Sequence, residues 1–329
     1  MERVSQSELW MKDPVALRRN RGTDPVFFAR SVFPDAAIED LATAVIWISW
    51  LYFWDDALDF GDLDNKTGRM SQYREETLSC IQHSLLNDGL NEDKDPVHIA
   101  PTCLAAQAWH SIGVHIQHRV TAPSSRKYMH DCLRDYVAAT IELQTHCDKA
   151  EILDIDSYLA IRMRTSGVYP TISLYLLTSR SEPPDWLFSH RLVQAALIEM
   201  NRIVSIYNDI VSAHLEIESG HIDNIIPLLM HHKSLSAQGA VDEAVQMIQD
   251  SYAAFRCLEA QITTLGREQD IAHEVSAFLK GCVNLCMGAL QWTYHIKRYF
   301  NYSPSMGPAE ISVVLGYSDQ TAGSDGSAH

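Results

Sequence analysis

The stretch Trp54-Asp55-Asp56-Ala57-Leu58-Asp59 closes an apolar, aromatic-rich run that begins at Leu41. Side chains four positions apart share one face of a helix, so Asp55 and Asp59 point the same way, whereas Asp56 lies about 100° around the helix. Two carboxylates at the end of an apolar helix suit a hard divalent cation such as Mg²⁺, which takes oxygen ligands and usually keeps waters and phosphate oxygens. The alternative interpretation is a solvated helix end in an acidic chain.

The helix that carries this stretch is predicted to extend from about residue 36 to 60. It is apolar almost all round, which is typical of a buried helix. Asp35 can cap its start and Gly61 can end it. The apolar pattern predicts further helices over about 67–86, 101–120, 124–147, 186–218, 223–235, 237–265 and 268–300.

One more predicted helix has an interrupted pattern. It starts near Asp156, which can cap it, and passes through Arg162. Gly167 and Pro170 then fall inside an otherwise helical segment. A glycine and a proline so placed predict a kink or bend, because proline removes a helix hydrogen bond and frees a carbonyl.

The overall pattern predicts an all-α fold. The sequence has no hairpin signals, no sustained two-residue alternation, no internal repeats and no glycine-rich phosphate loop. We therefore expect a single-domain α-helical bundle of about ten helices around a central apolar cavity. Residues 25–302 should form this domain, preceded by a lead-in over residues 1–24 and followed by a mobile tail over residues 303–329.

The composition limits the class of function. The chain has 329 residues, 46% of them apolar, and a formal net charge of -16. Such a charge argues against a nucleic-acid-binding protein, which needs a basic footprint, and against an electrostatic membrane anchor. The longest apolar run, Leu41 to Trp54, has 14 residues and is too short to span a bilayer. The polar N-terminus and seven scattered cysteines, without CxxC spacing, favour a soluble, reduced, cytoplasmic protein.

A second polar stretch, Asn208-Asp209-Ile210-Val211-Ser212-Ala213-His214-Leu215-Glu216, continues an apolar helix. Asn208, Ser212 and Glu216 stand at i, i+4 and i+8, so they share one helical face. They offer an amide oxygen, a hydroxyl and a carboxylate, which together carry a single formal charge. Such a set suits one Mg²⁺ that also binds an anionic substrate. Taken alone, the row is also compatible with an ordinary polar helix face.

Together the two stretches resemble the metal-binding motifs of class I terpene synthases, especially the microbial sesquiterpene cyclases. That family carries DDxxD late in one helix and NDxxSxxxE about 150 residues later, as this chain does. The family also has a diphosphate-sensing arginine 46 residues before the Asn of the second motif. Arg162 stands there, followed by Thr165-Ser166-Gly167, which looks like the family's effector segment. The family's terminal Arg-Tyr pair, with a Trp shortly before it, matches Arg298-Tyr299 and Trp292, so the resemblance covers residues from about 25 to 300.

This resemblance implies a Mg²⁺-dependent enzyme acting on a linear prenyl diphosphate. Three Mg²⁺ ions are expected, two of them held by Asp55, Asp56 and Asp59 and the third by Asn208, Ser212 and Glu216. The groups expected to bind the diphosphate are Arg162, Arg298, Tyr299 and, more weakly, Ser166. Arginine suits this task because its planar fork binds phosphate through two parallel hydrogen bonds.

In the implied reaction the diphosphate leaves and an allylic carbocation cyclises, so the cavity must be dry and apolar. Tyr52 and Leu51, three and four residues before Asp55, share its helical face and should line that cavity. Aromatic faces attract cations. Trp292, six residues before Arg298, is therefore the leading candidate to stabilise the carbocation. The released diphosphate can take the final proton, because no general base stands out.

One position departs from the family pattern. The family usually has Lys or Arg just before the last Glu of the second motif, and this chain has Leu215. One cationic contact to the diphosphate is therefore expected to be missing. His214, Arg202 and Lys297 are candidates to replace it.

Several alternatives stay open at this point. Farnesyl diphosphate and a sesquiterpene product are favoured, with monoterpene and diterpene cyclases of the same class as alternatives. A chain-elongating prenyltransferase would carry a second DDxxD, which residues 208–216 lack. A non-catalytic helical binding protein and a zinc site at His110, His115 and His118 are further alternatives. Besides the substrate, the family suggests a homodimer as a partner, and the product skeleton cannot be read from the sequence.

Overall fold

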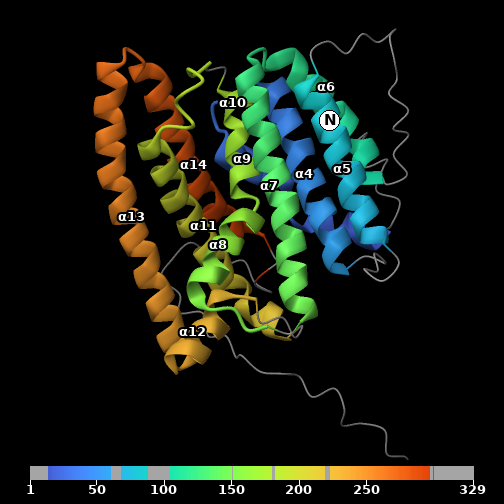
Figure 1. Cartoon of the computed structure of the whole chain (residues 1–329), viewed down its shortest axis with the longest axis vertical. Coiled ribbons are helices and arrows are strands. Elements are labelled where there is room, and N and C mark those ends of the chain that lie inside the picture. Colours follow the sequence, from blue (N-terminus) through green and yellow to red (C-terminus); the bar gives the residue numbers. More distant parts are fainter. Residues whose placement is uncertain are drawn as a thin grey trace, which may run out of the picture.

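The computed structural model describes residues 14–60, 68–87, 104–149, 151–179, 182–218, 223–296 and 299 (Figure 1). Among these residues, all regular secondary structure is α-helical, which confirms the predicted all-α class. The described helices are α2 (Pro14–Gly22), α3 (Pro25–Val32), α4 (Ile38–Phe60), α5 (Arg69–Leu86), α6 (Leu104–Arg119), α7 (Pro123–Asp148), α8 (Ile155–Thr165), α9 (Val168–Ser173), α10 (Tyr175–Thr178), α11 (Arg191–Glu218), α12 (Ile225–Lys233), α13 (Ala237–Glu268) and α14 (Ala272–His295). Of these thirteen, α9 and α10 have only six and four residues.

Helix α4 is buried through its tryptophans. Trp47, Trp50 and Trp54 are each fully buried. The indole of Trp50 donates to the Ala105 carbonyl at 2.8 Å, and that of Trp54 donates to the Thr77 hydroxyl at 3.0 Å. The polar N–H groups of Trp50 and Trp54 are therefore satisfied inside the bundle, as a buried tryptophan usually requires, whereas the indole N–H of Trp47 is buried without a hydrogen-bond partner among the described residues. These contacts fix α4 against α5 and α6.

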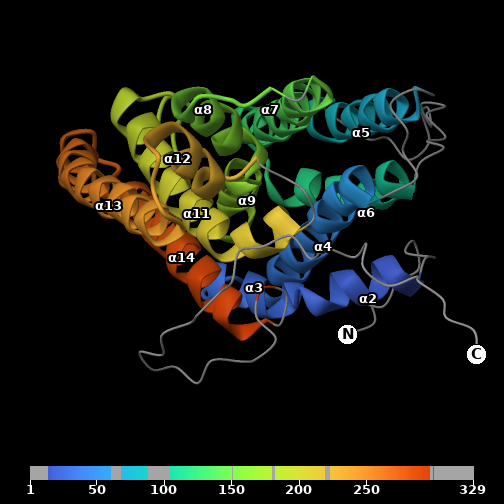
Figure 2. The ribbon, with the colours of Figure 1, turned by 90° about the horizontal axis from the view of Figure 1, so that it is seen from below.

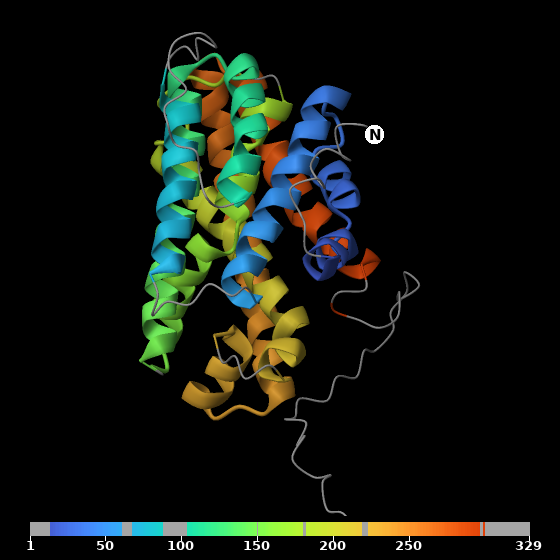
Figure 3. The same cartoon turned by 90° about the vertical axis from the view of Figure 1, so that its right-hand side faces the viewer.

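The helices surround a short inner segment. Seen along the long axis of the bundle, α9 lies inside the ring of longer helices, and it contacts α7, α8, α11 and α14 (Figure 2). Helices α2 and α3 lie on the outside of α4 and α14 (Figure 3). Residues 14–22, which the sequence placed in a lead-in, are helical, and Asn20 donates a hydrogen bond of 2.8 Å to the Ser49 carbonyl of α4.

Four predicted helix starts were wrong, including that of α14, which begins at Ala272 instead of about residue 268. Helix α4 begins at Ile38, and Asp35 pairs with Lys280 rather than capping it. Asp154, not Asp156, caps α8 by accepting a hydrogen bond from the Ser157 backbone N–H at 2.9 Å. Helix α11 begins at Arg191 instead of residue 186, because residues 184–190 form hydrogen-bonded turns.

The predicted break at Gly167 is confirmed. Gly167 has φ +72°, a left-handed conformation that ends α8 and starts α9. Glycine adopts this conformation without the steric cost that a Cβ would bring. A Cβ at this position would also lie 3.2 Å from Leu51 Cδ2. The break therefore brings the α8–α9 junction against α4, four residues before Asp55.

No described helix is both long and apolar enough to cross a membrane.

We expect Gly288→Ala to lower the free energy of unfolding by about 1–3 kcal/mol, the usual cost of overpacking. A Cβ at Gly288 on α14 would lie 2.8 Å from the backbone carbonyl carbon of Ser31 on α3, and a backbone atom cannot rotate away. Urea denaturation measures the change. Gly22→Ala is the control, because a Cβ there meets nothing within 4 Å. Equal losses in the two variants would contradict the close approach of α3 and α14.

Candidate metal and diphosphate site

The carboxylates at the end of α4 have different surroundings. Asp55 is half-buried, and its Oδ1 accepts a hydrogen bond of 2.7 Å from the hydroxyl of Tyr136 on α7. The Tyr136 ring packs on the buried Trp54 with ring centroids 5.4 Å apart, and this packing inside the bundle positions the Tyr136 hydroxyl. Asp56 is only 6% exposed and lies inside the bundle. Asp59 belongs to α4, but its side chain lies outside the described residues.

The second motif lies along α11, with Asn208, Ser212 and Glu216 four residues apart. Asn208 is held on both sides of its amide. Its Oδ1 accepts a hydrogen bond of 2.7 Å from Arg162 Nη2, and its Nδ2 donates one of 2.9 Å to the hydroxyl of Tyr299. Asn208, Ser212 and Glu216 are called the triad. Two of the residues predicted to bind diphosphate, Arg162 and Tyr299, therefore meet at its first residue.

Arg162 is anchored by a buried acid that the sequence interpretation missed. Its Nε donates to Asp209 Oδ1 at 2.8 Å. The other oxygen, Oδ2, accepts from the Tyr158 hydroxyl at 2.6 Å and from the Ile225 backbone N–H at 3.2 Å. Burial, the largest single effect, would lower the pKa of Arg162. The charges of Asp209, Tyr158 and Glu216 and the hydrogen bond to Asp209 together outweigh it, so the pKa is raised. Arg162 therefore stays charged although its side chain is only 17% exposed.

A signal for Asp209 was present in the sequence. It follows Asn208 directly, so its side chain lies about 100° around α11 from that of Asn208. An acidic residue on the buried face of an apolar helix requires a partner, since an unpaired buried charge is costly. Arg162 is that partner. Its dual contact with Asn208 and Asp209 was not predicted.

Glu216 lies in a half-buried environment at the end of the triad. Its Oε2 accepts a hydrogen bond of 2.9 Å from Asn224 Nδ2. Burial raises the pKa of Glu216, the nearby charge of Asp209 adds to this, and hydrogen bonds from Asn224 and Ser212 act in the opposite direction. Asn224, the N-cap of α12, is a second residue that sequence reasoning missed.

Aromatic side chains link α4 to α14 and, through Tyr299, to Asn208 on α11. The rings of Tyr52 and Trp292 stack with centroids 5.7 Å apart, and Trp292 meets Tyr299 edge-on at 6.1 Å. The indole N–H of Trp292 donates to the Thr23 carbonyl, which fixes its orientation. Tyr299 in turn accepts the hydrogen bond from Asn208. A continuous chain of contacts therefore links the face of Asp55 to the triad.

Of the remaining predicted site residues, Ser166 is described by the structure and Arg298 is not. The Ser166 hydroxyl lies at the α8–α9 break and donates to Asn201 Oδ1 at 2.9 Å. Asn201 is fully buried, and its Nδ2 donates to the Met163 carbonyl at 2.6 Å, so α11 supports the break. Arg298 lies outside the described residues, and so does Lys297.

The three side chains of the triad on α11 are a ligand set that fits Mg²⁺. It offers amide, hydroxyl and carboxylate oxygens, the hard ligands that this ion prefers. Each of the three side chains has a hydrogen-bonding partner from another element within 3.5 Å. Asn208 contacts Arg162 and Tyr299. Ser212 and Glu216 both contact Asn224. Partners of this kind orient metal ligands.

A family profile described as "Terpene synthase family 2, C-terminal metal binding" matches residues 46–254, which include both motifs. The chain belongs to the terpene synthase family. It is a class I terpene synthase, a lyase with a metal-binding domain, as its resemblance implied.

Individual relatives agree with this assignment. The germacrene A synthase of Nostoc punctiforme is 27% identical over 278 residues, which cover 84% of this chain and 80% of the relative. The terpene cyclase braA of Annulohypoxylon truncatum is 24% identical over 280 residues, covering 85% of this chain and 73% of the relative.

Solved structures share the fold. The linalool/nerolidol synthase of Streptomyces clavuligerus, in complex with 2-fluorogeranyl diphosphate, matches with a TM-score of 0.76 at 17% identity, over 88% of this chain and 96% of that one. An α-eudesmol synthase matches with a TM-score of 0.75 at 17% identity, over 89% and 94%. The class I all-α architecture is therefore established for this terpene synthase.

The family's cationic position is apolar in this terpene synthase. Leu215 is half-buried and packs against the main core. Arg202, a candidate replacement, pairs with Glu199 on the same helix, with 3.4 Å between Nη1 and Oε2. Leu215 therefore contributes packing at the position where the resemblance to class I terpene synthases leads us to expect a positive charge.

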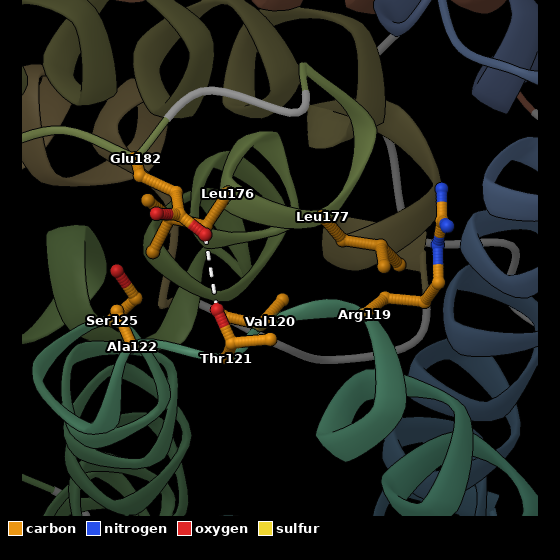
Figure 4. A pocket seen from close by; sticks show the side chains of 8 residues that line it. All are labelled: Arg119, Val120, Thr121, Ala122, Ser125, Leu176, Leu177 and Glu182. Atoms are coloured by element: carbon orange, nitrogen blue, oxygen red, sulfur yellow. Dashed lines mark hydrogen bonds between the residues drawn. The ribbon is translucent and has the colours of Figure 1, made fainter.

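A hollow of about 210 Å³ lies elsewhere, around the turn between α6 and α7 (Figure 4). On its rim, the Thr121 hydroxyl donates to Glu182 at 3.0 Å. Arg119, also on the rim, donates two hydrogen bonds of 2.9 Å to Asp40 near the start of α4. Asp55 follows Asp40 by 15 residues, roughly 22 Å along a helix. This hollow is therefore not the central cavity that the sequence predicts.

The histidines of α6 do not form a zinc site. Within the described part of the chain, no three His, Cys, Asp or Glu side chains come together in a metal-binding group. His115 instead lies 3.5 Å from Asp40, and His110 and His118 are exposed.

We expect Asp209→Asn to lower the free energy of unfolding by about 3–5 kcal/mol, because it leaves the buried guanidinium of Arg162 without its counter-charge. Urea denaturation with and without the substitution measures this loss. Asp135→Asn is the matched control, since Asp135 pairs with Arg134 in an exposed ion pair, and such pairs contribute about 0–1 kcal/mol. A loss below about 1 kcal/mol in Asp209→Asn would show that the Arg162–Asp209 pair does not hold the fold.

Proposed function

We propose that this terpene synthase is a Mg²⁺-dependent sesquiterpene cyclase. It ionises farnesyl diphosphate, cyclises the resulting allylic carbocation and releases diphosphate. The observation that carries the proposal is the junction at Asn208, where one amide contacts both Arg162 and Tyr299. The chain length of the substrate is supported by relatives named for sesquiterpene products or chemistry, such as the sesquiterpene cyclase hepA of Aspergillus oryzae, 25% identical over 286 residues.

The metal ligands are proposed to be those of the two motifs. Asp55, Asp56 and Asp59 hold two Mg²⁺ ions, and Asn208, Ser212 and Glu216 hold the third. When bound, the ions neutralise charge that develops on the leaving diphosphate. Tyr136 keeps one oxygen of Asp55 hydrogen-bonded, which orients the carboxylate before any ion arrives.

The protein's own groups bind and orient the diphosphate. A guanidinium has five N–H donors, and the contacts of Arg162 with Asp209 and Asn208 use one each of Nε and Nη2. Arg162 can therefore offer further donors to the leaving group without losing its anchor. Arg298 and the Tyr299 hydroxyl are proposed to add donors from the end of the chain. Ser166 contributes through the position of the α8–α9 break.

The carbocation is proposed to form beside the aromatic cluster. Tyr52 and Trp292 present stacked rings next to the α4 face of Asp55. Their faces attract positive charge, and their apolar bulk excludes the water that would quench the cation. Monoterpene synthesis is the second candidate within the same chemistry, supported by the 2-fluorogeranyl diphosphate, a C10 analogue, bound to the linalool/nerolidol synthase.

The cellular setting is part of the same proposal. All six described cysteines are free thiols, which supports a reducing compartment such as the cytoplasm. Elongation of a prenyl chain is not favoured, because residues 208–216 lack a second DDxxD cluster. They carry two carboxylates, Glu216 and Asp209, and Asp209 is paired with Arg162.

The test is product analysis. The purified protein is incubated with C10, C15 and C20 prenyl diphosphates, with Mg²⁺ or with EDTA, and organic extracts are analysed by gas chromatography–mass spectrometry. We expect a cyclic hydrocarbon or alcohol from the C15 substrate alone, and only with Mg²⁺. Asp55→Ala and Asn208→Ala should each lower the rate about 100-fold or more, because loss of an orienting neighbour alone costs 10–100-fold. Asp135→Asn, at an exposed position on α7, should leave the rate unchanged.

Other outcomes discriminate between the alternatives. A longer prenyl diphosphate formed when a C5 co-substrate is added would assign the chain to elongation. Absence of turnover of every substrate by the folded protein would overturn the cyclase proposal. Product formation from C10 or C20 alone would keep the class and change the substrate.

A further inference from the structure

Asn224 makes more contacts than its place in the fold requires. It is the N-cap of α12, is fully buried, and accepts a hydrogen bond of 2.8 Å from the Ile226 backbone N–H through Oδ1. That contact is the ordinary function of an N-cap. Its amide nitrogen points the other way, toward α11.

The amide nitrogen contacts the metal-binding face at three points. It donates to the Asp209 carbonyl at 2.8 Å and to Glu216 Oε2 at 2.9 Å, and it lies 3.5 Å from Ser212 Oγ. These three residues stand at i, i+3 and i+7, so one side chain follows a single face of α11 over two turns. Two of the three, Ser212 and Glu216, are members of the triad.

Capping alone does not explain an asparagine here. Two neighbouring helices are capped by residues that only accept at the cap, Asp154 for α8 and Ser236 for α13. Serine, aspartate and asparagine cap about equally well. Among them only asparagine adds N–H donors on the far side of the cap. The donors are what the contacts with α11 use.

We propose that Asn224 is a positioning residue for the metal site, an inference that rests on the proposed function. It holds the Glu216 carboxylate by one oxygen and approaches the Ser212 hydroxyl from the α12 side. The remaining lone pairs of both groups are thereby directed toward the side on which Asn208 also lies. Because the same side chain caps α12, it also ties the start of that helix to the backbone of α11.

Two substitutions of Asn224 separate its function as a hydrogen-bond donor to α11 from its function as the N-cap of α12. Asn224→Ser keeps an oxygen able to cap α12 but is too short to reach Glu216. Asn224→Asp keeps the shape and the capping oxygen, and replaces the donor by an acceptor that faces Glu216. The control is Ser236→Ala, which removes the side-chain cap of α13, a bond of 3.1 Å to the Gly239 N–H, without touching the triad.

Three measurements are made on the full chain. Thermal unfolding in EDTA reports the fold without metal. Isothermal titration calorimetry reports the binding of inorganic diphosphate at increasing Mg²⁺ concentration, and steady-state turnover gives the Mg²⁺ concentration for half-maximal rate. Loss of an orienting neighbour typically weakens a metal site 10–100-fold. We expect Asn224→Ser to raise the Mg²⁺ requirement about 10–100-fold in both binding and turnover, and Asn224→Asp to raise it further. Ser236→Ala should lower the unfolding temperature and keep the wild-type requirement.

The outcomes keep this inference apart from the proposed function. A wild-type protein with neither Mg²⁺-dependent turnover nor Mg²⁺-dependent diphosphate binding would refute the function itself. A functional wild type with an unchanged Mg²⁺ requirement in Asn224→Ser would overturn the positioning role. Unfolding of both Asn224 variants, under conditions where Ser236→Ala stays folded, would also overturn it, because Asn224 would then be purely structural.

Discussion

The buried ion pair between Arg162 and Asp209 is the interaction on which the site depends. A guanidinium loses much hydration when it is buried, and a buried pair repays this only when its remaining donors and acceptors are satisfied. Here the Tyr158 hydroxyl and the Ile225 backbone N–H donate hydrogen bonds to the Asp209 carboxylate, and Asn208 accepts one from the Arg162 guanidinium. The pair therefore joins α8, α11 and the start of α12. It also explains how a chain of net charge -16 keeps one arginine fixed beside Asn208, a proposed metal ligand.

The features predicted from the sequence were those set by local geometry. The 3.6-residue period places Asn208, Ser212 and Glu216 on one face whatever surrounds the helix. Gly167 marks the break because a left-handed residue ends a helix locally. The fold class followed from apolar periodicity in the same way. Each of these needs only neighbours along the chain, which is the information that a single sequence contains.

The features that were missed depend on residues far apart in sequence. Tyr136 lies 81 residues from Asp55, and Tyr158 lies 51 from Asp209. No local pattern pairs them. The wrong cap of α8 has a subtler cause. Asp154 and Asp156 are equally good cap residues, and the choice depends on which backbone N–H groups the start of the helix leaves unpaired.

The site shows how an acidic protein can orient carboxylates, here the proposed metal ligands, without adding charge. Asp55 is oriented by a tyrosine and Glu216 by an asparagine, and both orienting groups are neutral donors from another segment. A cation in their place would lower the negative charge that attracts Mg²⁺, whereas a neutral donor fixes the carboxylate and leaves its charge available to the ion. Leu215 fits the same scheme, because it packs into the core at a position where a cation is usual in the family. The positive charge described beside Asn208 is therefore concentrated in Arg162, and the ion pair with Asp209 holds that charge in place. Under the proposed function, this anchoring fixes the donor that meets the diphosphate.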